Sequence, residues 1–362
     1  MLPNKTALKL IRKYITIFKE QRDIEEFKEE LINNLINNRM LVKTDDGTYT
    51  LVSEEKDELM HSRIGALTES VEKFVIPSNL KDMDNPKILD LCSGMGYNTI
   101  AALHFNKNCN IDMVEYSEET LFLSLCLNIP YKEHELIKEL IKDYFLKNNN
   151  YNNNKNNLNR TNNVGACSKN DKITLYLGDA RKIVKNLNKT YNIVFHDAFS
   201  PQRDAVLYTV DFLKEIYKKM DNNSVLISYS SSIPFRSALV EVGFVLSEGA
   251  PIGRKRGITL AYKNPSLDRD LKRISEVDER LIALSTVGVP YRDDNLNLDH
   301  DAIVINRENE RKKLKEELSK INKYYSTKKV KLGKIDEKFL NIQKLDLNSS
   351  EIIKKMKEEL KN

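Results

Sequence analysis

Four carboxylates stand at the ends of four successive apolar runs in the middle of the chain, at Asp90, Glu115, Asp179 and Asp197. Any one of these acids alone would more often be a capping or solubility residue. Ligands of open parallel sheets bind outside the carboxyl ends of the strands. Four acids in such places therefore predict a sheet edge that binds a nucleoside.

The turn after the first of these runs favours a cofactor without phosphates. Its sequence is LDLCSGMGYN (residues 89–98), in which Asp90 can accept a hydrogen bond from an ammonium or a hydroxyl group. Gly94 and Gly96 let a ligand approach the main chain closely, because glycine has no Cβ. The pattern is not the GxGxxG fingerprint of dinucleotide-binding proteins, since Cys92 stands where the first glycine would be. We therefore expect S-adenosylmethionine here; the alternative is a purely structural turn.

The other three acids suit different parts of such a ligand and its reaction partner. Glu115 could hold both ribose hydroxyls, and Asp179, which follows Gly178, could accept from the adenine amino group. Asp197 opens the segment DAFSP (residues 197–201). By its position alone, Asp197 is either a strand-end cap or the group that handles the substrate.

Strands and helices alternate from Lys87 onward. The predicted strands cover residues 87–92, 110–116, 172–180, 191–197, 224–230, 244–248 and 257–264. Strands separated by helical patterns indicate βαβ units and a mostly parallel sheet. The last two strands are too close in sequence for a helical crossover, so they should pair antiparallel. The prediction is an α/β fold with a mostly parallel seven-stranded sheet and an antiparallel last strand.

The chain divides in sequence into three parts. Residues 1–60 show one or two amphipathic helices and a hairpin that turns at Asp45-Asp46-Gly47, and residues 61–265 hold the alternating strands and helices. Residues 148–170 interrupt this domain with an asparagine-rich insert that we expect to be disordered. Residues 266–362 form a helical, basic extension, whose final forty residues should be weakly ordered.

Charge and composition limit the kinds of partner that the protein can have. The chain has 58 Lys and Arg against 53 Asp and Glu, a net charge of +5, yet residues 311–334 alone hold ten basic and two acidic residues. This stretch, which includes Tyr324 and Tyr325, is either a solvated basic helix or a contact surface for a phosphate backbone. No apolar run is long enough for a membrane helix, and Lys and Arg interrupt the N-terminus too often for a signal peptide. We expect a cytoplasmic protein without a membrane partner.

The cysteines give no sign of a metal site. Cys92, Cys109, Cys126 and Cys167 show no CxxC spacing, which argues against a zinc site and a disulfide framework. We expect reduced thiols and no bound metal.

Residues 61–262, and more weakly the chain to residue 311, resemble the MnmC-like methyltransferases, the tRNA 5-aminomethyl-2-thiouridine methyltransferase group. The resemblance rests on HSRIGALTESVEKFV, ILDLCSGMGYNT, LGDARKIV, DAFSP, ISYSSSIPFRSALVEVGF and GRKRGITLAY. DAFSP and GRKR in this order are more specific than a generic glycine turn. The resemblance implies a Rossmann-like class I methyltransferase fold. It also implies transfer of a methyl group from S-adenosylmethionine to the 5-aminomethyl nitrogen of a wobble uridine in tRNA.

The resemblance also assigns residues. It places Asp90, Gly94, Gly96, Glu115, Asp179 and, less directly, Glu69 in the cofactor site. It makes Asp197 and Tyr229 catalytic, and it gives substrate or RNA contacts to Phe199, Arg236, Lys255 and Arg256. Asp197 could orient the lone pair of the amine and take its proton through water. Phe199 would shape a dry pocket, and Tyr229 could stack on or hydrogen-bond the base.

The sequence departs from the family in ways that leave alternatives open. Cys92 stands where the family often has glycine, and RDAVLYT after DAFSP lacks the family's Leu-Trp-Thr. A methyltransferase of the same fold could act on a small-molecule or protein amine. The basic GRKR segment disfavours an aminopropyltransferase such as spermidine synthase, and the intact acids disfavour a non-enzymatic RNA-binding module. The expected partners are tRNA, bound by GRKR and the C-terminal extension, and a separate enzyme that supplies the aminomethyl uridine.

Overall fold

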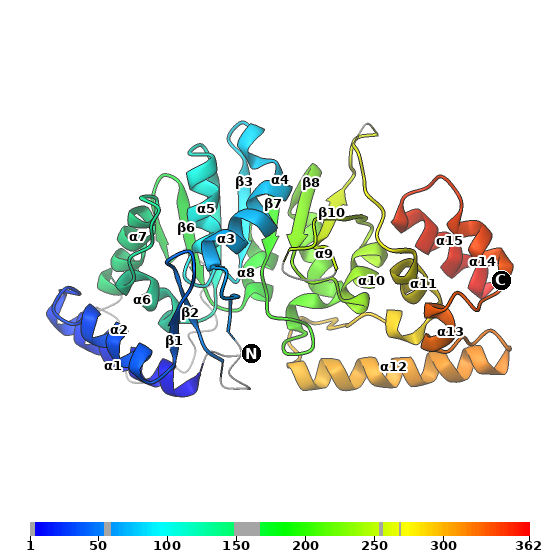
Figure 1. The fold of residues 1–362 in the computed structure, drawn as a ribbon, viewed down its shortest axis with the longest axis horizontal. Coiled ribbons are helices and arrows are strands. Elements are labelled where there is room, and N and C mark those ends of the chain that lie inside the picture. The colour runs from blue at the N-terminus through cyan, green and yellow to red at the C-terminus, as the bar shows by residue number, and fades with distance from the viewer. Residues whose placement is uncertain (1–3, 54–58, 148–166, 253–255, 268) are drawn as a thin grey trace. The chain divides into compact units, whose positions relative to one another are not determined.

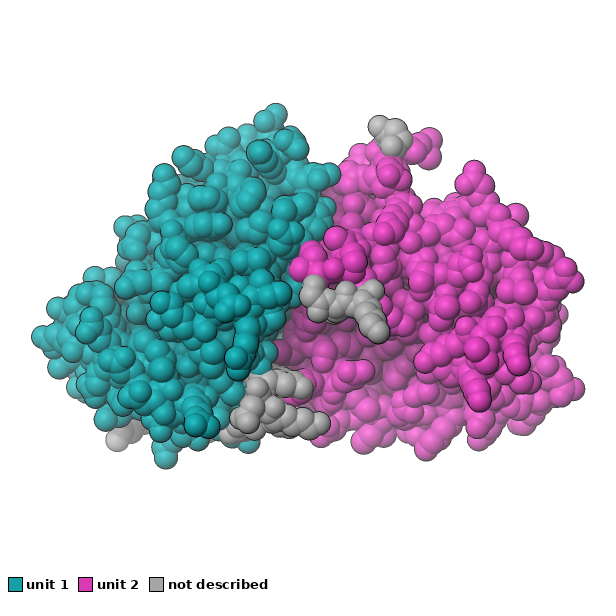
Figure 2. Space-filling view, in the orientation of Figure 1, with its two compact units in different colours: residues 1–186, 195–197 teal, residues 187–194, 198–362 magenta. Residues whose placement is uncertain are grey.

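The computed structural model describes residues 4–53, 59–147, 167–252, 256–267 and 269–362. The chain forms two compact units (Figure 2). Unit 1 contains residues 1–186 and 195–197, and unit 2 contains residues 187–194 and 198–362. The division therefore falls inside the alternating region that the sequence marks as one domain.

The N-terminal part of unit 1 has the predicted helices and hairpin. Its elements are α1 (Lys5–Gln21), α2 (Lys28–Asn37), β1 (Leu41–Lys43) and β2 (Tyr49–Leu51). The Asn4 side chain caps α1 by accepting from the backbone N–H groups of Thr6 and Ala7. Strand β1 pairs antiparallel with β2, and Gly47 takes the positive φ of +84° that the turn requires.

The strands of unit 1 follow the order β5-β6-β4-β3. They comprise β3 (Lys87–Leu91), β4 (Asn110–Glu115), β5 (Ser168–Lys169) and β6 (Ile173–Leu177). Strand β4 is parallel to both β3 and β6, whereas β5 is antiparallel to β6. Strand β5 was not predicted, because it falls within the asparagine-rich insert; residues 148–166 of that insert lie outside the described residues.

Helices connect these strands, as Figure 1 shows. Before β3 lie α3 (Ala66–Ser70), the π-helical turn η1 (Val71–Val75), α4 (Ile76–Ser78) and the 3₁₀ turn η2 (Leu80–Asp82). After it come α5 (Tyr97–Phe105), α6 (Glu118–Cys126), α7 (His134–Lys147) and α8 (Ala180–Asn186). Helix α5 begins directly after the glycine turn, and its first seven residues are buried.

The strands of unit 2 follow the order β7-β8-β10-β9. They are β7 (Tyr191–His196), whose last two residues belong to unit 1, β8 (Met220–Ser228), β9 (Val245–Glu248) and β10 (Thr259–Lys263). Strand β10 is antiparallel to both β8 and β9, which confirms the predicted antiparallel pairing at the end of the sheet. The fold is therefore α/β with a mostly parallel sheet, and it has eight strands where seven were predicted.

Helices make up the rest of unit 2. They are η5 (Val206–Tyr208), α9 (Val210–Lys218), α10 (Ile233–Val242), α11 (Glu276–Leu284), η6 (Thr286–Gly288), α12 (His300–Lys320), α13 (Thr327–Lys331), α14 (Glu337–Gln343) and α15 (Ser349–Lys361). Across the described part of the chain, no helix has the length and apolar character needed to span a membrane.

The expectation of weak order at the C-terminus is wrong. Helices α13 to α15 gather beside α11 (Figure 1). Ile352, Ile353 and Met356 of α15 are fully buried, and Asn348 with Glu351 forms a capping box at its start. The order was missed because the apolar residues are few and are spread over short, charged helices.

Candidate active site

All four acids at the strand ends belong to unit 1. Asp90 lies near the end of β3, Glu115 ends β4, and Asp179 follows β6. Because these three strands are parallel neighbours, their carboxyl ends share one edge. The backbone N–H of Asp197 donates to the carbonyl of Leu91 at 3.3 Å, which brings the fourth acid to the end of β3. We call Asp90, Glu115, Asp179 and Asp197 the acid edge.

The glycine turn leaves room beside its main chain. Cys92, Gly94 and Gly96 all have positive φ, at 59°, 56° and 86°. A Cβ added to Gly94 would meet only the carbonyl oxygen of Cys92, at 3.8 Å, whereas one added to Gly96 would lie 3.0 Å from Ile137 of α7. Gly94 therefore faces space that a ligand can occupy. Gly96 instead allows the turn to pack closely against α7. Cys92 takes a conformation that favours glycine.

Glu115 holds this turn in place. Its Oε2 accepts from the Gly94 N–H at 2.7 Å, and its Oε1 accepts from the Ser117 N–H at 2.8 Å. Burial raises the pKa of Glu115 despite these hydrogen bonds. Each carboxylate oxygen has a second lone pair, so Glu115 can still accept from hydroxyl groups of a ligand.

Asp90 is buried without a full set of donors. Its Oδ2 accepts from Thr99 Oγ1 at 2.7 Å, but its Oδ1 makes no hydrogen bond with a described residue. Burial raises the pKa of Asp90 to about 7; the Thr99 hydrogen bond opposes this, and the nearby Asp197 and Glu115 carboxylates add to it. A ligand that brings a positive charge or N–H groups would stabilise the ionised form.

Asp197 is half-buried and held by an amide. Its Oδ2 accepts from Asn98 Nδ2 at 3.0 Å. Burial raises the pKa of Asp197, while His61, Asn98 and Lys73 oppose that rise. A carboxylate whose pKa is raised takes a proton more readily at neutral pH, which suits the predicted role of Asp197.

The sequence did not point to Asn98 and Thr99, which each hold one acid. They are consecutive residues in the first turn of α5. Both are buried in a helix whose other buried residues are mainly apolar. Two polar residues directly after a glycine turn, ahead of an apolar run, are the signal that could have found them.

Glu69 of α3 is engaged within unit 1. It forms an ion pair with Lys73 at 2.8 Å, and His61 Nδ1 lies 3.7 Å from its carboxylate. Burial alone would raise the pKa of Glu69, but His61 and Lys73 lower it to about 2. The ring of His61 also meets that of Tyr97 edge-on. His61 and Lys73 are basic residues beside Glu69 that sequence reasoning did not identify.

Asp179 is engaged in its own turn. Its carboxylate pairs with Arg181 at 2.8 Å and accepts from the Arg181 backbone N–H at 2.9 Å, at the start of α8. The adenine contact assigned to Asp179 remains a prediction.

The remaining predicted residues belong to unit 2. Phe199 and Tyr229 are half-buried after β7 and β8. Arg236 of α10 is 0% exposed and pairs with Glu248 and Asp278, each at 3.0 Å. This position makes Arg236 a support for the ends of β9 and β10, and only the resemblance predicts an RNA contact for it.

The GRKR segment is described at its last residue alone. Arg256 is exposed and pairs with Asp278 at 3.0 Å. Lys255 lies outside the described residues. Within the described ranges, no group of three or more His, Cys, Asp or Glu residues is placed to hold a metal ion.

The acid edge fits S-adenosylmethionine. The cofactor carries an ammonium group, ribose hydroxyls and a positively charged sulfonium. Asp90 offers a buried acceptor that lacks a partner among the described residues, and Gly94 leaves space beside the main chain. Asp90, Gly94 and Glu115 are the residues that would hold it.

Comparison with known proteins identifies the class of enzyme. Residues 131–264 match the family described as S-adenosyl-L-methionine-dependent methyltransferase. An uncharacterized protein of Methanocaldococcus jannaschii is 58% identical over 361 residues, which cover 99% of this chain and 96% of that protein.

Two further relatives carry the MnmC name. The tRNA 5-methylaminomethyl-2-thiouridine biosynthesis bifunctional protein MnmC of Ralstonia nicotianae is 29% identical over 89 residues, or 25% of this chain; the match spans only 14% of that protein. The crystal structure of MnmC2 from Aquifex aeolicus superposes with a TM-score of 0.56 at 27% identity and covers 84% of this chain and 99% of that one. The chain belongs to the MnmC-like family of S-adenosyl-L-methionine-dependent methyltransferases.

Proposed function

We propose that this methyltransferase acts on the 5-aminomethyl group of a wobble uridine in tRNA. The observation that carries the proposal is Asp197, which opens the DAFSP motif and lies at the acid edge with a raised pKa. The name of the Ralstonia relative, which refers to 5-methylaminomethyl-2-thiouridine biosynthesis in tRNA, supports this substrate.

The methyl transfer requires the protein to align the two reactants and to supply one proton acceptor. When bound, S-adenosylmethionine supplies a methyl group on a positively charged sulfur. A primary alkylamine has a pKa near that of lysine, about 10, and attacks only in its neutral form. Asp197 would accept a hydrogen bond from the amine and take the proton released on methylation. Holding the two reactants in line can supply about 7–11 kcal/mol of the barrier.

Exposed lysines in unit 2 support tRNA as the partner. Arg307 and Arg311 of α12 turn inward and donate to backbone carbonyls of residues 286–289. The C-terminal lysine surface comprises exposed residues of α12, α13 and the segment that follows: Lys312, Lys320, Lys328, Lys329, Lys331 and Lys334. Lysines that neutralise phosphates release counterions, so such a surface favours a nucleic-acid backbone.

The proposed substrate implies an earlier modification step and a cytoplasmic reaction. A uridine that already carries a primary amine must come from an enzyme that installs the aminomethyl group. The reaction would take place in the cytoplasm, where tRNA is modified.

Nucleoside mass spectrometry of tRNA from a deletion strain tests the proposal. A strain that lacks the protein should lose one methyl group from a wobble uridine and accumulate the primary amine. The wild-type gene should restore the methyl group, and a gene encoding Asp197→Asn should not. An unchanged set of wobble nucleosides in the deletion strain would contradict this substrate and would favour a small-molecule or protein amine.

A further inference from the structure

Asn98 occupies a special position at the acid edge. It is the second residue of α5 and is 3% exposed. Its Nδ2 donates to Asp197 Oδ2 at 3.0 Å, and its side chain lowers the pKa of both Asp90 and Asp197. The NH₂ group of Asn98 therefore faces Asp197.

The other half of this amide has no partner among the described residues. Asn98 Oδ1 is buried and makes no hydrogen bond with a described residue. The reverse orientation would place Oδ1 against an ionised carboxylate oxygen, which would repel it. An unsatisfied buried acceptor destabilises the folded state, and such groups in native proteins call for an explanation. A bound ligand with an N–H group would satisfy it.

We propose that Asn98 positions the acceptor amine and limits the reaction to one methyl transfer. This inference rests on the proposed function. A neutral primary amine has two N–H groups and one lone pair. The Asp197 carboxylate accepts one N–H and Asn98 Oδ1 accepts the other, so the lone pair is left to point at the methyl group.

The bonds and charges of the step balance. The nitrogen lone pair forms the new N–C bond as the C–S bond breaks, and the pair from that bond stays on sulfur. The amine is then a secondary ammonium, and one proton passes from it to the Asp197 carboxylate and on to water. The neutral product has a single N–H.

This single N–H explains the limit of one methyl group. It can satisfy Asp197 or Asn98 Oδ1 but not both, so the lone pair is no longer held by two hydrogen bonds. A second transfer then loses the alignment that made the first one fast. Without the Asn98 acceptor, the primary and the secondary amine can each make one hydrogen bond, to Asp197. The site then no longer aligns the primary amine better than the secondary amine.

The test measures the product of each variant on tRNA that carries 5-aminomethyluridine. We expect Asn98→Ala to lower kcat by about 10- to 100-fold, to leave the affinity for S-adenosylmethionine unchanged, and to release a fraction of dimethylated nucleoside. Asn98→Ser keeps a small polar group in the buried site and guards against a folding defect; it should show the same dimethylated product.

Asn106 provides the matched control at the end of the same helix. Its Nδ2 donates to the carbonyls of Leu80 and Met83, at 2.7 and 2.8 Å, so its amide is engaged structurally. Asn106→Ala should reduce stability but keep a single methyl group on the product. Only monomethylated product from both Asn98 variants, or a fall in cofactor affinity parallel to kcat, would overturn the inference. If the wild-type protein methylated no such tRNA, the proposed function itself would fail instead.

Discussion

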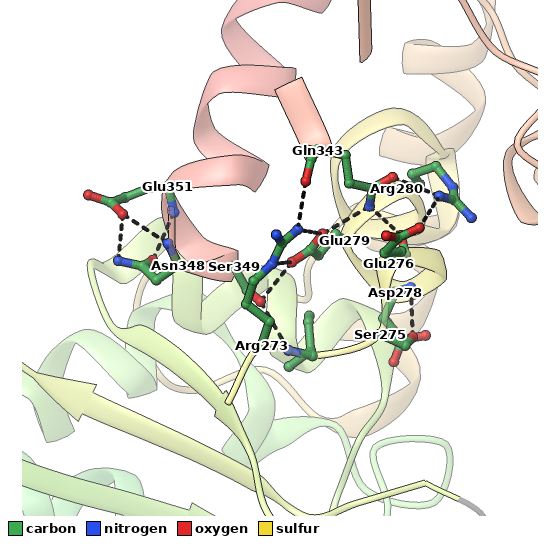
Figure 3. Close-up of polar contacts among 11 residues, drawn as sticks. Arg273, Ser275, Glu276, Asp278, Glu279, Arg280, Gln343, Asn348, Ser349 and Glu351 are labelled. Carbon is green, nitrogen blue, oxygen red and sulfur yellow. Dashed lines mark hydrogen bonds and ion pairs between the residues drawn. The ribbon is translucent and has the colours of Figure 1, made fainter. Parts of the chain in front are cut away.

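The Glu279 cluster of unit 2, which comprises Glu279 and its donors Arg273, Gln343 and Ser349, differs from the acid edge of unit 1 in how completely carboxylate charge is compensated. In unit 2, Glu279 of α11 is 0% exposed and accepts four hydrogen bonds (Figure 3). Arg273 donates two of them, at 3.0 and 2.7 Å, Gln343 donates one at 2.9 Å and Ser349 one at 2.8 Å. These donors come from α14, from the start of α15 and from the segment before α11, so Glu279 ties the C-terminal helices together.

Asp90 of the acid edge in unit 1 lacks this completeness. Among the described residues, Thr99 donates to one oxygen of Asp90 and the other oxygen has no donor. The pKa values of Asp90, Glu115 and Asp197 are all raised. A buried carboxylate with a full set of donors serves the fold, whereas buried acids short of donors indicate a ligand. The difference separates a structural cluster from a functional one without reference to any relative.

The largest expected effect comes from removing the charge of Asp197. Asp197→Asn should lower methyl transfer by about 10²- to 10⁴-fold, the usual contribution of a general base, and leave the affinity for S-adenosylmethionine nearly intact. Calorimetry and a transfer assay measure the two quantities. Asp204→Asn, further along the same segment, is the control and should behave like the wild type. A parallel loss of cofactor affinity would assign Asp197 to the cofactor pocket instead.

Removing Glu279 should affect stability and not ligand binding. Glu279→Ala leaves Arg273 without its carboxylate and should lower the free energy of unfolding by about 3 kcal/mol, as measured by urea unfolding. Glu241→Ala breaks an exposed pair with Arg292 at 2.7 Å and should cost less than about 1 kcal/mol. If Glu279→Ala lowered cofactor affinity as strongly as stability, the distinction between the two clusters would be lost.

Asp90 should make stability depend on pH in a definite direction. Its pKa is about 7 in the folded chain and about 3.9 in an unfolded one. Between these values the folded state holds a proton that the unfolded state has lost, so stability falls as pH rises from about 4 to about 7. Asp90→Asn should remove this fall and gain on the order of 2 kcal/mol over the wild type at high pH.

Unfolding of both proteins at about pH 5 and about pH 8 measures this effect. Asn can still accept the hydrogen bond from Thr99, so the variant isolates the charge. The same pH slope in the two proteins would show that Asp90 is not the group responsible. Added S-adenosylmethionine should stabilise the wild type more than Asp90→Asn.

The C-terminal lysine surface should give the smallest effects. Replacing Lys328 and Lys329 by alanine should weaken tRNA binding by a few-fold and reduce the salt dependence of log K by about one unit per lost phosphate contact. Lys338, which pairs with Glu359 at 2.7 Å, is the control, and Lys338→Ala should change the salt slope less. An unchanged slope in the double variant would remove this surface from RNA binding.

The strand ends and the glycine turn could be predicted from the sequence because both depend on local patterns. Apolar runs of strand length end at Asp90, Glu115 and Asp197, and the parallel order brings such ends to one edge. The structure adds the contacts that no local pattern encodes. Asn98 reaches Asp197 across ninety-nine positions of the chain.

Other features were missed or remain predictions for similar reasons. Nothing local in the sequence indicates that Arg236 is buried, since its partners Asp278 and Glu248 come from distant segments. The C-terminal helices depend on the Glu279 cluster, whose members are also far apart in sequence. Strand β5 contributes only two residues and gains its order from β6.

Methyl transfer in vitro tests the central claim most directly. The protein would be incubated with S-adenosylmethionine and tRNA that carries 5-aminomethyluridine, and the digested nucleosides analysed by mass spectrometry. The account predicts one added methyl group on that nucleoside with the wild-type protein and none with Asp197→Asn. Cofactor binding without any methylation of this tRNA, together with methyl transfer to a small-molecule or protein amine, would contradict it.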